Sequence, residues 1–407
     1  MRYFSKVPVN PLFLPADMPK RILFLSFYFE PDLCAGSFRN SPLAYELARQ
    51  AKSIDVEIDV ITTLPNRYST YSAQAPEFEK RDNLTINRIR IPSHKSGTKD
   101  QINSYHTYFS ATHKLVKGKH YDMVYASSSR LFTAYLGYRI ASQRKIPLYL
   151  DIRDIFVDTI KDVFSNPLVK KLVLPIMSFI ENKTFSYASH INLISGGFKE
   201  YFQKFNVPLI TEYSNGIDPV FLNAPKQLIS EIKKVRTIIY AGNIGEGQGL
   251  HRIVPQAAKA FGDSFQFRII GDGGAKSKLM NAIDGMSNVK LLPPVSREML
   301  IDEYNSADFL FMHLNDYDAF KKVLPSKVFE LGVFPKPLIA GVNGYSRFFV
   351  EQNLPGSILV DPCNAVELVE KVRQYNIEVS LDRSVFIDRY RRDSINEKMA
   401  DSILKYL

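Results

Sequence analysis

Two charged residues at the start of a short predicted helix are the strongest chemical signal in the sequence. Residues 323–340 read VLPSKVFELGVFPKPLIA, which predicts a helix over Lys327–Leu331 and a strand over Leu338–Ala340. Lys327 and Glu330 are three residues apart, so they share one helix face. A cation at a helix start suits a diphosphate, and a carboxylate suits ribose hydroxyls. The pair predicts a nucleotide-sugar site; the alternative interpretation is a helix-surface ion pair.

Glycine-rich turns follow two predicted strands in the same half of the chain. Residues 240–250 read YAGNIGEGQGL, and residues 271–274 read GDGG. Glycine lets the backbone approach a ligand closely, so we expect these turns to contact a phosphate or a base. The alternative interpretation is that they only reverse the chain. The glycines expected to contact the nucleotide-sugar, which would be the donor in a transfer reaction, are Gly242, Gly245, Gly271 and Gly273.

The long loop before the Lys327 helix carries further charges. Residues 312–327 read MHLNDYDAFKKVLPSK, in which Lys322 and Ser326 lie nearest to the predicted helix. We expect both to contact the donor, although a run of charges is usually a solvated surface. His313 follows an apolar strand, and such a histidine is more often structural than catalytic.

The first predicted strand leads into a loop, Phe29–Arg39, with the sequence FEPDLCAGSFR. Gly36 and Ser37 lie where a helix begins, so free backbone N–H groups there can hold a phosphate or sugar oxygen. The alternative is a simple turn in which Ser37 caps the helix. Arg39, at the end of this loop, is expected to bind the acceptor.

A second candidate for the acceptor side is the segment DIRD at residues 151–154. It ends a buried strand, so Asp151, Arg153 and Asp154 are expected to face a cleft. The carboxylate of Asp154 can position an acceptor hydroxyl or accept its proton. The alternative interpretation is an Arg–Asp pair that fixes the loop.

Alternating strand and helix patterns position all of these residues. Short apolar runs such as Arg21–Phe27 indicate strands buried on both faces. The alternation restarts after residues 214–218, SNGID, and therefore predicts two doubly wound α/β domains with a ligand cleft between them. The expected divisions are an irregular extension (1–19), an N-terminal domain (20–213), a C-terminal domain (214–385) and a helical tract (386–407).

Composition narrows the class of protein. The chain has 407 residues, of which 45% are hydrophobic and 23% charged, as in globular proteins. Its two cysteines, Cys34 and Cys363, fit no metal spacing, and with no recognisable signal peptide we expect a cytoplasmic location. No apolar run reaches the ~20 residues of a membrane span.

The positive charge is concentrated in the first half. Residues 1–200 hold 27 basic and 18 acidic residues, whereas residues 201–407 hold 25 and 24. Such a face attracts anionic lipid, nucleic acid or a phosphorylated substrate, and the alternative is a solvated surface. The chain lacks the aromatic–basic pattern of RNA-binding modules, so we expect no nucleic-acid partner.

Taken in order, these motifs resemble family-4 glycosyltransferases of the GT-B fold. The resemblance spans Arg21 to about Leu368 and is carried by RILFLSFYFEPDLCAGSFR, LYLDIRD, INLISGGF, SNGID, IIYAGNIGEGQGL, FRIIGDGG, NVKLLPPVSREML, YNSADFLFMHL and LPSKVFELGVFPKPLIA. Similarity extends to N-acetyl-fucosaminyl transferase-like proteins of O-antigen and capsule synthesis. The resemblance implies two Rossmann-like domains, and we expect the C-terminal helix to return to the first.

The resemblance also implies sugar transfer with retention, without a metal or other cofactor. The donor would be a nucleotide-sugar, with UDP favoured, and the acceptor a polyprenyl-diphosphate-linked saccharide at the inner face of the cytoplasmic membrane. Glu330 matches the second Glu of the E-x7-E motif, but Lys322 occupies the first position. Asn243 and Gln248 stand where the family has Arg and Lys. We therefore expect Lys327, with Lys322, to supply the missing positive charge.

Two alternatives share the same donor site. A GT-B nucleotide-sugar 2-epimerase would convert the donor without an acceptor. A non-catalytic nucleotide-binding relative would bind the donor without turnover, and the departures from the family motifs leave this alternative open.

Overall fold

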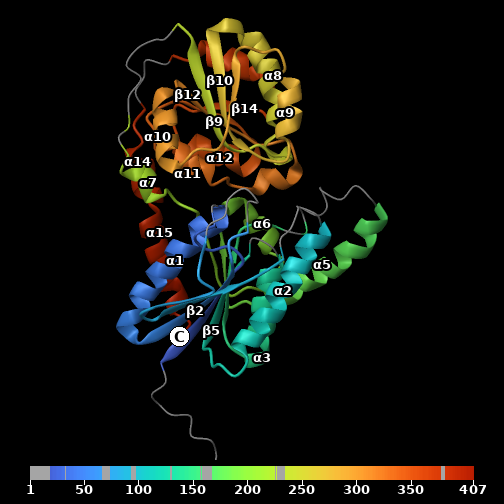
Figure 1. Ribbon diagram of the computed structural model, residues 1–407, viewed down its shortest axis with the longest axis vertical. Helices are drawn as coiled ribbons and strands as arrows, with labels where there is room; N and C mark the ends of the chain where they lie inside the picture. Colours follow the sequence, from blue (N-terminus) through green and yellow to red (C-terminus); the bar gives the residue numbers. More distant parts are fainter. Residues whose placement is uncertain are drawn as a thin grey trace, which may run out of the picture.

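Two α/β domains lie end to end, the N-terminal one below and the C-terminal one above in Figure 1. This computed structural model describes residues 19–32, 34–66, 74–92, 98–128, 131–155, 157, 167–224, 226, 234–376 and 381–407, with only the backbone for 98–101 and 167–170. The expected extension at 1–19 lies outside the described residues except for Pro19. Two Rossmann-like domains confirm the predicted fold class.

The N-terminal domain contains an eight-stranded sheet of order β3-β4-β2-β1-β5-β6-β7-β8. Only the β3–β4 pair is antiparallel. The first strand has no exposed residue from Ile22 to Leu25, because helices cover both faces of the sheet. The strands are β1 (Lys20–Ser26), β2 (Val56–Thr63), β3 (Phe78–Arg81), β4 (Leu84–Ile89), β5 (Met123–Ser128), β6 (Leu148–Ile152), β7 (His190–Leu193) and β8 (Ile210–Thr211).

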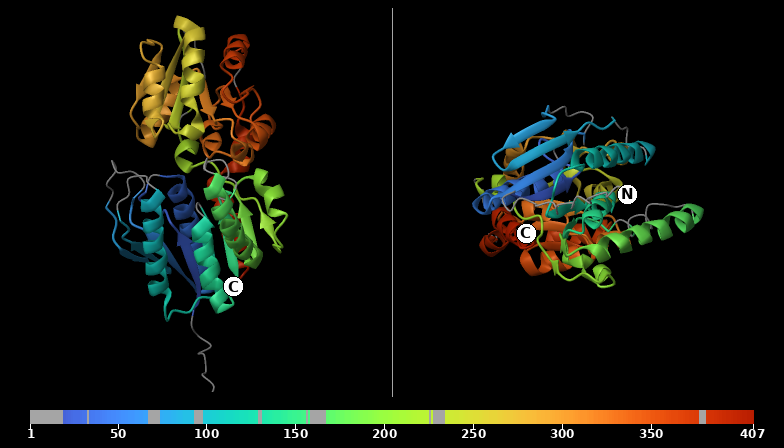
Figure 2. Two further views of the ribbon diagram at one scale, coloured as in Figure 1. Left: turned by 90° about the vertical axis from the view of Figure 1, so that its right-hand side faces the viewer. Right: turned by 90° about the horizontal axis from the view of Figure 1, so that it is seen from below.

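Helices cover this sheet on both sides (Figures 1 and 2). One core forms against the α2–α3–α5 side and a separate core against α1. The helices of this region are α1 (Ala35–Ala51), α2 (Thr98–Val116), α3 (Leu131–Arg144), α5 (Pro167–Tyr187) and α6 (Lys199–Phe202), with 3-10 turns η1 (Lys52–Ile54) and η2 (Gly196–Phe198).

The C-terminal domain has a six-stranded parallel sheet of order β11-β10-β9-β12-β13-β14. Its strands are β9 (Arg236–Asn243), β10 (Phe265–Asp272), β11 (Val289–Leu292), β12 (Phe309–His313), β13 (Leu338–Gly341) and β14 (Ile358–Val360). The helices are α7 (Pro219–Leu222), α8 (Leu250–Phe261), α9 (Lys276–Ala282), α10 (Arg297–Ser306), α11 (Lys327–Leu331), α12 (Gly344–Asn353), α13 (Ala365–Gln374) and α14 (Ser384–Tyr390), with 3-10 turns η3 (Glu246–Gln248), η4 (Gly262–Ser264) and η5 (Asp318–Lys322).

The last helix, α15 (Arg392–Leu404), crosses back and packs on α1 of the N-terminal domain (Figure 1). Met399, Ala400 and Ile403 are fully buried in the α1 core. Where the chain returns, Arg391 pairs with Ile217 of the outgoing connection in an isolated parallel bridge. This arrangement confirms the expected return of the C-terminal helix.

Candidate functional site

A cavity of about 230 Å³ lies between the domains. The N-terminal domain contributes the start of α1, and the C-terminal domain contributes α10 and α11. The connections between the domains complete the wall. The lining residues are Ala35, Phe38, Arg39, Asn215, Gly216, Asp218, Phe221, Arg297, Leu300, Ser326, Lys327, Glu330 and Arg392.

The predicted Lys327–Glu330 pair lines this cavity. Lys327 Nζ lies 2.8 Å from Glu330 Oε1, and the Tyr304 hydroxyl donates to the same oxygen at 2.5 Å. Burial, followed by the charge of Glu330, raises the pKa of Tyr304 well above its ordinary value, so the phenol remains a donor. Glu330 Oε2 accepts no hydrogen bond from the part of the chain that the structure describes. One carboxylate oxygen is therefore held in place and the other is available to a ligand.

The two glycine-rich turns pack on each other beside this pair. A Cβ on Gly271 would lie 1.9 Å from the carbonyl oxygen of Gly242, and one on Gly273 would lie 2.6 Å from that of Ile244. Neither approach is possible for a larger residue. Gly242 in turn faces Lys327, whose Cε would be 3.6 Å from an added Cβ. Close backbone packing accounts for Gly271 and Gly273 without a ligand, while Gly242 lies next to Lys327, which lines the cavity.

Asn243 and Gln248 bind each other rather than Lys327. The Asn243 amide donates to Gln248 Oε1 at 2.7 Å, and the Gly245 backbone N–H donates to the same oxygen at 3.2 Å. Their side chains close the β9–α8 turn, which places them outside the residues that line the cavity.

The structure separates Lys322 from Lys327. Lys322 Nζ lies 5.6 Å from the ring centroid of Tyr201 in the N-terminal domain, and the Lys322 carbonyl accepts from the Ser195 hydroxyl at 2.6 Å. Lys322 therefore contributes to contact between the domains, and it does not line the cavity. This placement corrects the expectation that the two lysines act together.

His313 is a structural residue. Its Nε2 accepts from the Cys363 N–H at 2.9 Å, so the neutral ring donates from Nδ1 to the Gln248 carbonyl at 2.6 Å. Burial lowers the pKa of His313 to about 4.

In the N-terminal domain, Arg153 lies against the start of α1, and it is not among the residues that line the cavity. A Cβ on Gly36 would lie 2.9 Å from Arg153 Nη1, so glycine is what admits the guanidinium there. Burial lowers the pKa of Arg153, and Asp151 offsets this only in part. Among the described residues, the Arg153 side chain has no ion pair and no hydrogen-bond partner, and its Nε is buried. Within the described residues it is therefore a cation at a helix start that feels the charge of Asp151 but forms no direct ion pair.

Arg39 lines the interdomain cavity but its guanidinium binds Asp151, and Asp151 does not face a cleft, contrary to the prediction. Their side chains are 3% and 0% exposed, and they bind each other at two points. Asn192 also donates to Asp151 at 2.8 Å, and Arg39 donates to the carbonyls of Tyr213 and Ser214. The Asp151 carboxylate cannot contact an acceptor, because it is fully buried and its oxygens are bound by Arg39 and Asn192.

The remaining predicted residues fall at different places. Ser326 lines the interdomain cavity. Ser37 is buried and lines a neighbouring groove along α1, and Asp154 is exposed and lines neither cavity. Asp154 therefore stays a prediction without a site.

A cluster that the sequence did not reveal joins the two domains. Asp218 binds Arg297 at 2.7 Å and also binds Arg392, while Arg297 lies 4.6 Å from the ring centroid of Phe38. Burial would raise the pKa of Asp218, but Arg392 and Arg297 hold it below its ordinary value. Asp218 belongs to the motif SNGID, whereas nothing in the local sequence marks the two arginines, which come from α10 and α15.

The described residues contain no group of three or more His, Cys, Asp and Glu side chains that could hold a metal ion.

Comparison with known proteins gives a consistent fold. No family model matches the chain. In sequence it is 28% identical over 143 residues to the putative colanic acid biosynthesis glycosyl transferase WcaI of Escherichia coli, which covers 34% of this chain and 35% of that protein. The match thus spans about a third of the length of the curated relative.

Solved structures are similar over nearly the whole chain. Sucrose-phosphate synthase of Thermosynechococcus elongatus has a TM-score of 0.72 at 12% identity, covering 95% of this chain and 98% of the other. HepE of Anabaena, in complex with UDP, has a TM-score of 0.65 at 15% identity, covering 95% of this chain and 100% of the other. WaaG, a glycosyltransferase involved in lipopolysaccharide biosynthesis, has a TM-score of 0.61 at 13% identity, covering 94% of this chain and 99% of the other. The protein therefore has the GT-B fold, two Rossmann-like domains joined across a cavity, as the resemblance implied.

Proposed function

We propose that the protein is a retaining glycosyltransferase that moves a sugar from a UDP-sugar to a lipid-linked saccharide in cell-surface polysaccharide synthesis. The observation that carries the proposal is Glu330, which has one oxygen fixed by Lys327 and Tyr304 and the other available in the interdomain cavity. The similarity to WcaI and WaaG, and the UDP in HepE, support the reaction class and the nucleotide.

In this proposal the donor is held from both domains. Glu330 Oε2 accepts the ribose hydroxyls, and Lys327 faces the diphosphate. Arg153 and the backbone N–H groups at the start of the 17-residue helix α1 approach the diphosphate from the other side. Negative charge on the leaving nucleotide grows in the transition state, and fixed cations stabilise it. Arg153, which we expected at the acceptor, thus supplies charge that Asn243 and Gln248 lack.

The proposed chemistry uses no protein nucleophile. The carboxylates that line the cavity, Asp218 and Glu330, are bound by arginines and by Lys327 with Tyr304, respectively. The bond from the anomeric carbon to the nucleotide breaks, and the acceptor oxygen forms its bond on the same face. The acceptor proton passes to an oxygen of the leaving phosphate, which accounts for retention and needs neither a metal nor another cofactor.

The lipid part of the proposal rests on α5, which projects from the side of the N-terminal domain (Figure 2). Leu172, Ile176 and Phe179 are 72%, 57% and 64% exposed, and their spacing places them along one helix face. Lys171 and Lys183, also exposed, lie near the two ends of this stripe. No helix in the described ranges is long and apolar enough to cross a membrane. An apolar stripe with lysines suits the surface of an anionic membrane, at which a polyprenyl-linked acceptor would be found.

Thermal unfolding with UDP, GDP and their sugars tests the proposal, because a ligand stabilises the fold by RT ln(1 + [L]/Kd). We expect UDP and one UDP-sugar to raise the melting temperature, and UDP release from that sugar to require an acceptor lipid fraction. Conversion of the sugar without acceptor would support an epimerase instead. Binding without turnover under any acceptor would support a non-catalytic protein, and no response to any nucleotide would contradict the donor site itself.

A further inference from the structure

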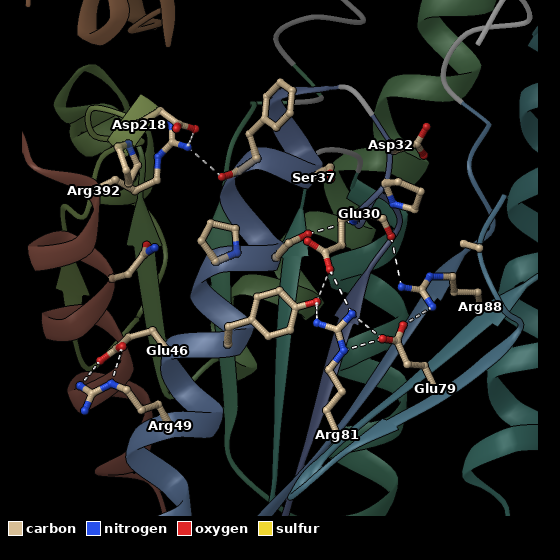
Figure 3. Close-up of a pocket in the computed structure, with 18 of the residues that line it drawn as sticks. Glu30, Asp32, Ser37, Glu46, Arg49, Glu79, Arg81, Arg88, Asp218 and Arg392 are labelled. Atoms are coloured by element: carbon tan, nitrogen blue, oxygen red, sulfur yellow. Dashed lines mark hydrogen bonds and ion pairs between the residues drawn. The ribbon is translucent and has the colours of Figure 1, made fainter. Parts of the chain in front are cut away.

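A second cavity, of about 900 Å³, runs along α1 on the side of β3 and β4 (Figure 3). Phe38, Asp218 and Arg392 line both this groove and the interdomain cavity, so the two spaces meet at the start of α1. The remaining lining residues are Glu30, Pro31, Asp32, Ser37, Ser41, Pro42, Tyr45, Glu46, Arg49, Gln74, Ala75, Pro76, Glu79, Arg81, Arg88, Pro219, Asp393 and Asn396.

The groove wall is a connected network of charged side chains (Figure 3). The Tyr45 hydroxyl donates to Glu30 Oε1, and Arg81 donates to the Tyr45 hydroxyl at 2.9 Å. Arg81 also binds Glu79, and Glu79 binds Arg88 at 2.9 Å. The network links α1 to strands β3 and β4, so the wall positions its polar atoms before any ligand arrives.

Two atoms of this network have no hydrogen-bond partner among the described residues. Glu30 Oε2 receives no hydrogen bond within the described ranges, and the Glu30 side chain is 39% exposed to the groove. Arg88 Nε is buried and makes no hydrogen bond, although the Arg88 side chain is only 3% exposed. Of the two, only the Glu30 oxygen can accept from a ligand in the groove, because Arg88 Nε is inaccessible.

The charge of the groove excludes one class of ligand. Its lining contains six carboxylates and four guanidinium groups, and most of these pair with one another. A phosphate or diphosphate would meet a net negative wall here, unlike in the interdomain cavity, which Lys327 lines. Hydroxyl groups fit better, since carboxylates accept from them and guanidinium groups donate to them.

Flat apolar surfaces lie between the polar groups. Phe38 and Tyr45 present rings, and Pro31, Pro42 and Pro76 present their pyrrolidine faces. Such surfaces pack against the C–H faces of sugar rings while carboxylates bind the hydroxyls. The volume is within the ~300–1,000 Å³ of sites for drug-sized ligands, which is room for more than one sugar ring.

We propose that this groove binds the saccharide portion of the acceptor as an uncharged chain of more than one sugar ring. The end that receives the new sugar lies at Phe38, Asp218 and Arg392, where the groove opens onto the donor cavity. This inference rests on the proposed function. It moves acceptor recognition from the buried Arg39–Asp151 pair to Glu30, Tyr45 and Arg81, which line the groove between α1 and β3.

Saturation-transfer NMR with two probes tests the proposal on the full chain. The probes are an uncharged trisaccharide of hexose and N-acetylhexosamine units and a trisaccharide of the same length that contains a uronic acid. We expect the uncharged probe alone to bind, and Glu30→Gln to weaken its binding roughly 10-fold or more, because hydrogen bonds to charged groups are strong. Arg81→Gln, at a side chain 53% exposed, should weaken it as well.

Glu57→Gln is the matched control, because Glu57 pairs with Arg21 in the same domain outside the groove. UDP binding, measured by calorimetry, should be equal in the unmodified protein and in the three variants Glu30→Gln, Arg81→Gln and Glu57→Gln. The proposal is overturned if Glu30→Gln and Arg81→Gln bind the uncharged probe as the unmodified protein does, or if the unmodified protein binds UDP but neither trisaccharide. Loss of UDP binding in the unmodified protein would instead contradict the proposed function.

Discussion

Arg39 on α1 and Asp151 at the end of β6 form a two-point ion pair inside the N-terminal domain, with both N–O distances at 2.7 Å. Burial alone would raise the pKa of Asp151, but the charge of Arg39 holds it below its ordinary value. Because Arg39 also binds the carbonyls of Tyr213 and Ser214, the pair fixes the point at which the chain leaves this domain.

Asp151→Asn is therefore expected to destabilise the fold rather than to affect catalysis specifically. Removing one member of a buried pair leaves an uncompensated charge and costs about 3–5 kcal/mol. Urea unfolding should show this loss in the N-terminal domain. Asp122→Asn, at a carboxylate of the same domain outside this core, is the control. A loss of activity in Asp151→Asn at unchanged stability would show that Asp151 acts in the reaction after all.

Glu330→Gln should weaken UDP binding about 10- to 100-fold, since a hydrogen bond to a charged group contributes about 1.5–3 kcal/mol. Calorimetry with UDP measures this directly. Glu367→Gln is a matched control, because Glu367 forms a comparable pair with Lys371 on α13, away from the cavity. Equal UDP affinity in both variants would exclude the proposed ribose contact.

Lys327→Met should lower turnover roughly 10²–10³-fold at saturating donor, as loss of a preorganised group at developing charge does in other enzymes. Lys371→Met is the control, because Lys371 forms a comparable pair with Glu367 away from the cavity and its loss should leave turnover unchanged. A Lys327→Met enzyme that keeps most of its turnover would contradict a role for Lys327 at the leaving group.

Arg153→Met is expected to separate activity from stability. The side chain has no ion pair among the described residues, so an apolar replacement should leave the melting temperature unchanged or raise it. Turnover should fall, because one cation at the diphosphate is lost, and Arg153→Lys should restore part of it. Arg139→Met, at an exposed site on α3, is the comparison. An Arg153→Met variant that is less stable but fully active would show that Arg153 stabilises the fold and does not act at the diphosphate.

Membrane association can be tested on α5. Changing Leu172, Ile176 and Phe179 together to Ser should lower binding to vesicles with anionic lipid at least about 10-fold, because burial of each such side chain contributes about 1.5–3 kcal/mol when complete. Cosedimentation measures this, and added salt should weaken the remaining binding. The control changes Met280, Val366 and Val385, which are also exposed, to Ser. Equal binding by the two triple variants would exclude α5 as the contact.

Acidification should destabilise the protein through His190 and His313. Burial lowers the pKa of each to about 4, whereas an unfolded histidine titrates near 6.5. The unfolded state therefore binds more protons between these values, and stability falls as pH decreases from about 6.5 toward 4. Each histidine contributes on the order of 1–2 kcal/mol to the loss between pH 7 and 5. Melting curves should show a smaller pH dependence in His313→Gln, and an equal dependence would contradict a neutral buried His313.

Much of the fold follows from local patterns in the sequence. The bounds of α11 agree with the sequence expectation, and β13 ends one residue later than expected. The short strands β3 and β8 were missed. β3 is an exposed edge strand of four residues, and β8 has two, so neither has enough apolar residues to show a period.

The site was less predictable than the fold. Lys327 and Glu330 line the interdomain cavity, and the sequence singled them out because they are neighbours on one helix. The partners of Asp218 come from positions 297 and 392, and the fold alone brings them together. Asp151 was expected to face a cleft and does not, because a strand end can point its carboxylate inward as readily as toward a cleft.

The return of α15 has a mechanical consequence. The chain passes between the domains twice, and the two passages lie side by side where Ile217 pairs with Arg391. Adjacent tethers resist sliding but allow rotation about the line that joins them. We therefore expect a hinge motion in which the domains rotate about an axis near Ile217 and Arg391. The cleft between them should open most at the edge farthest from these two residues.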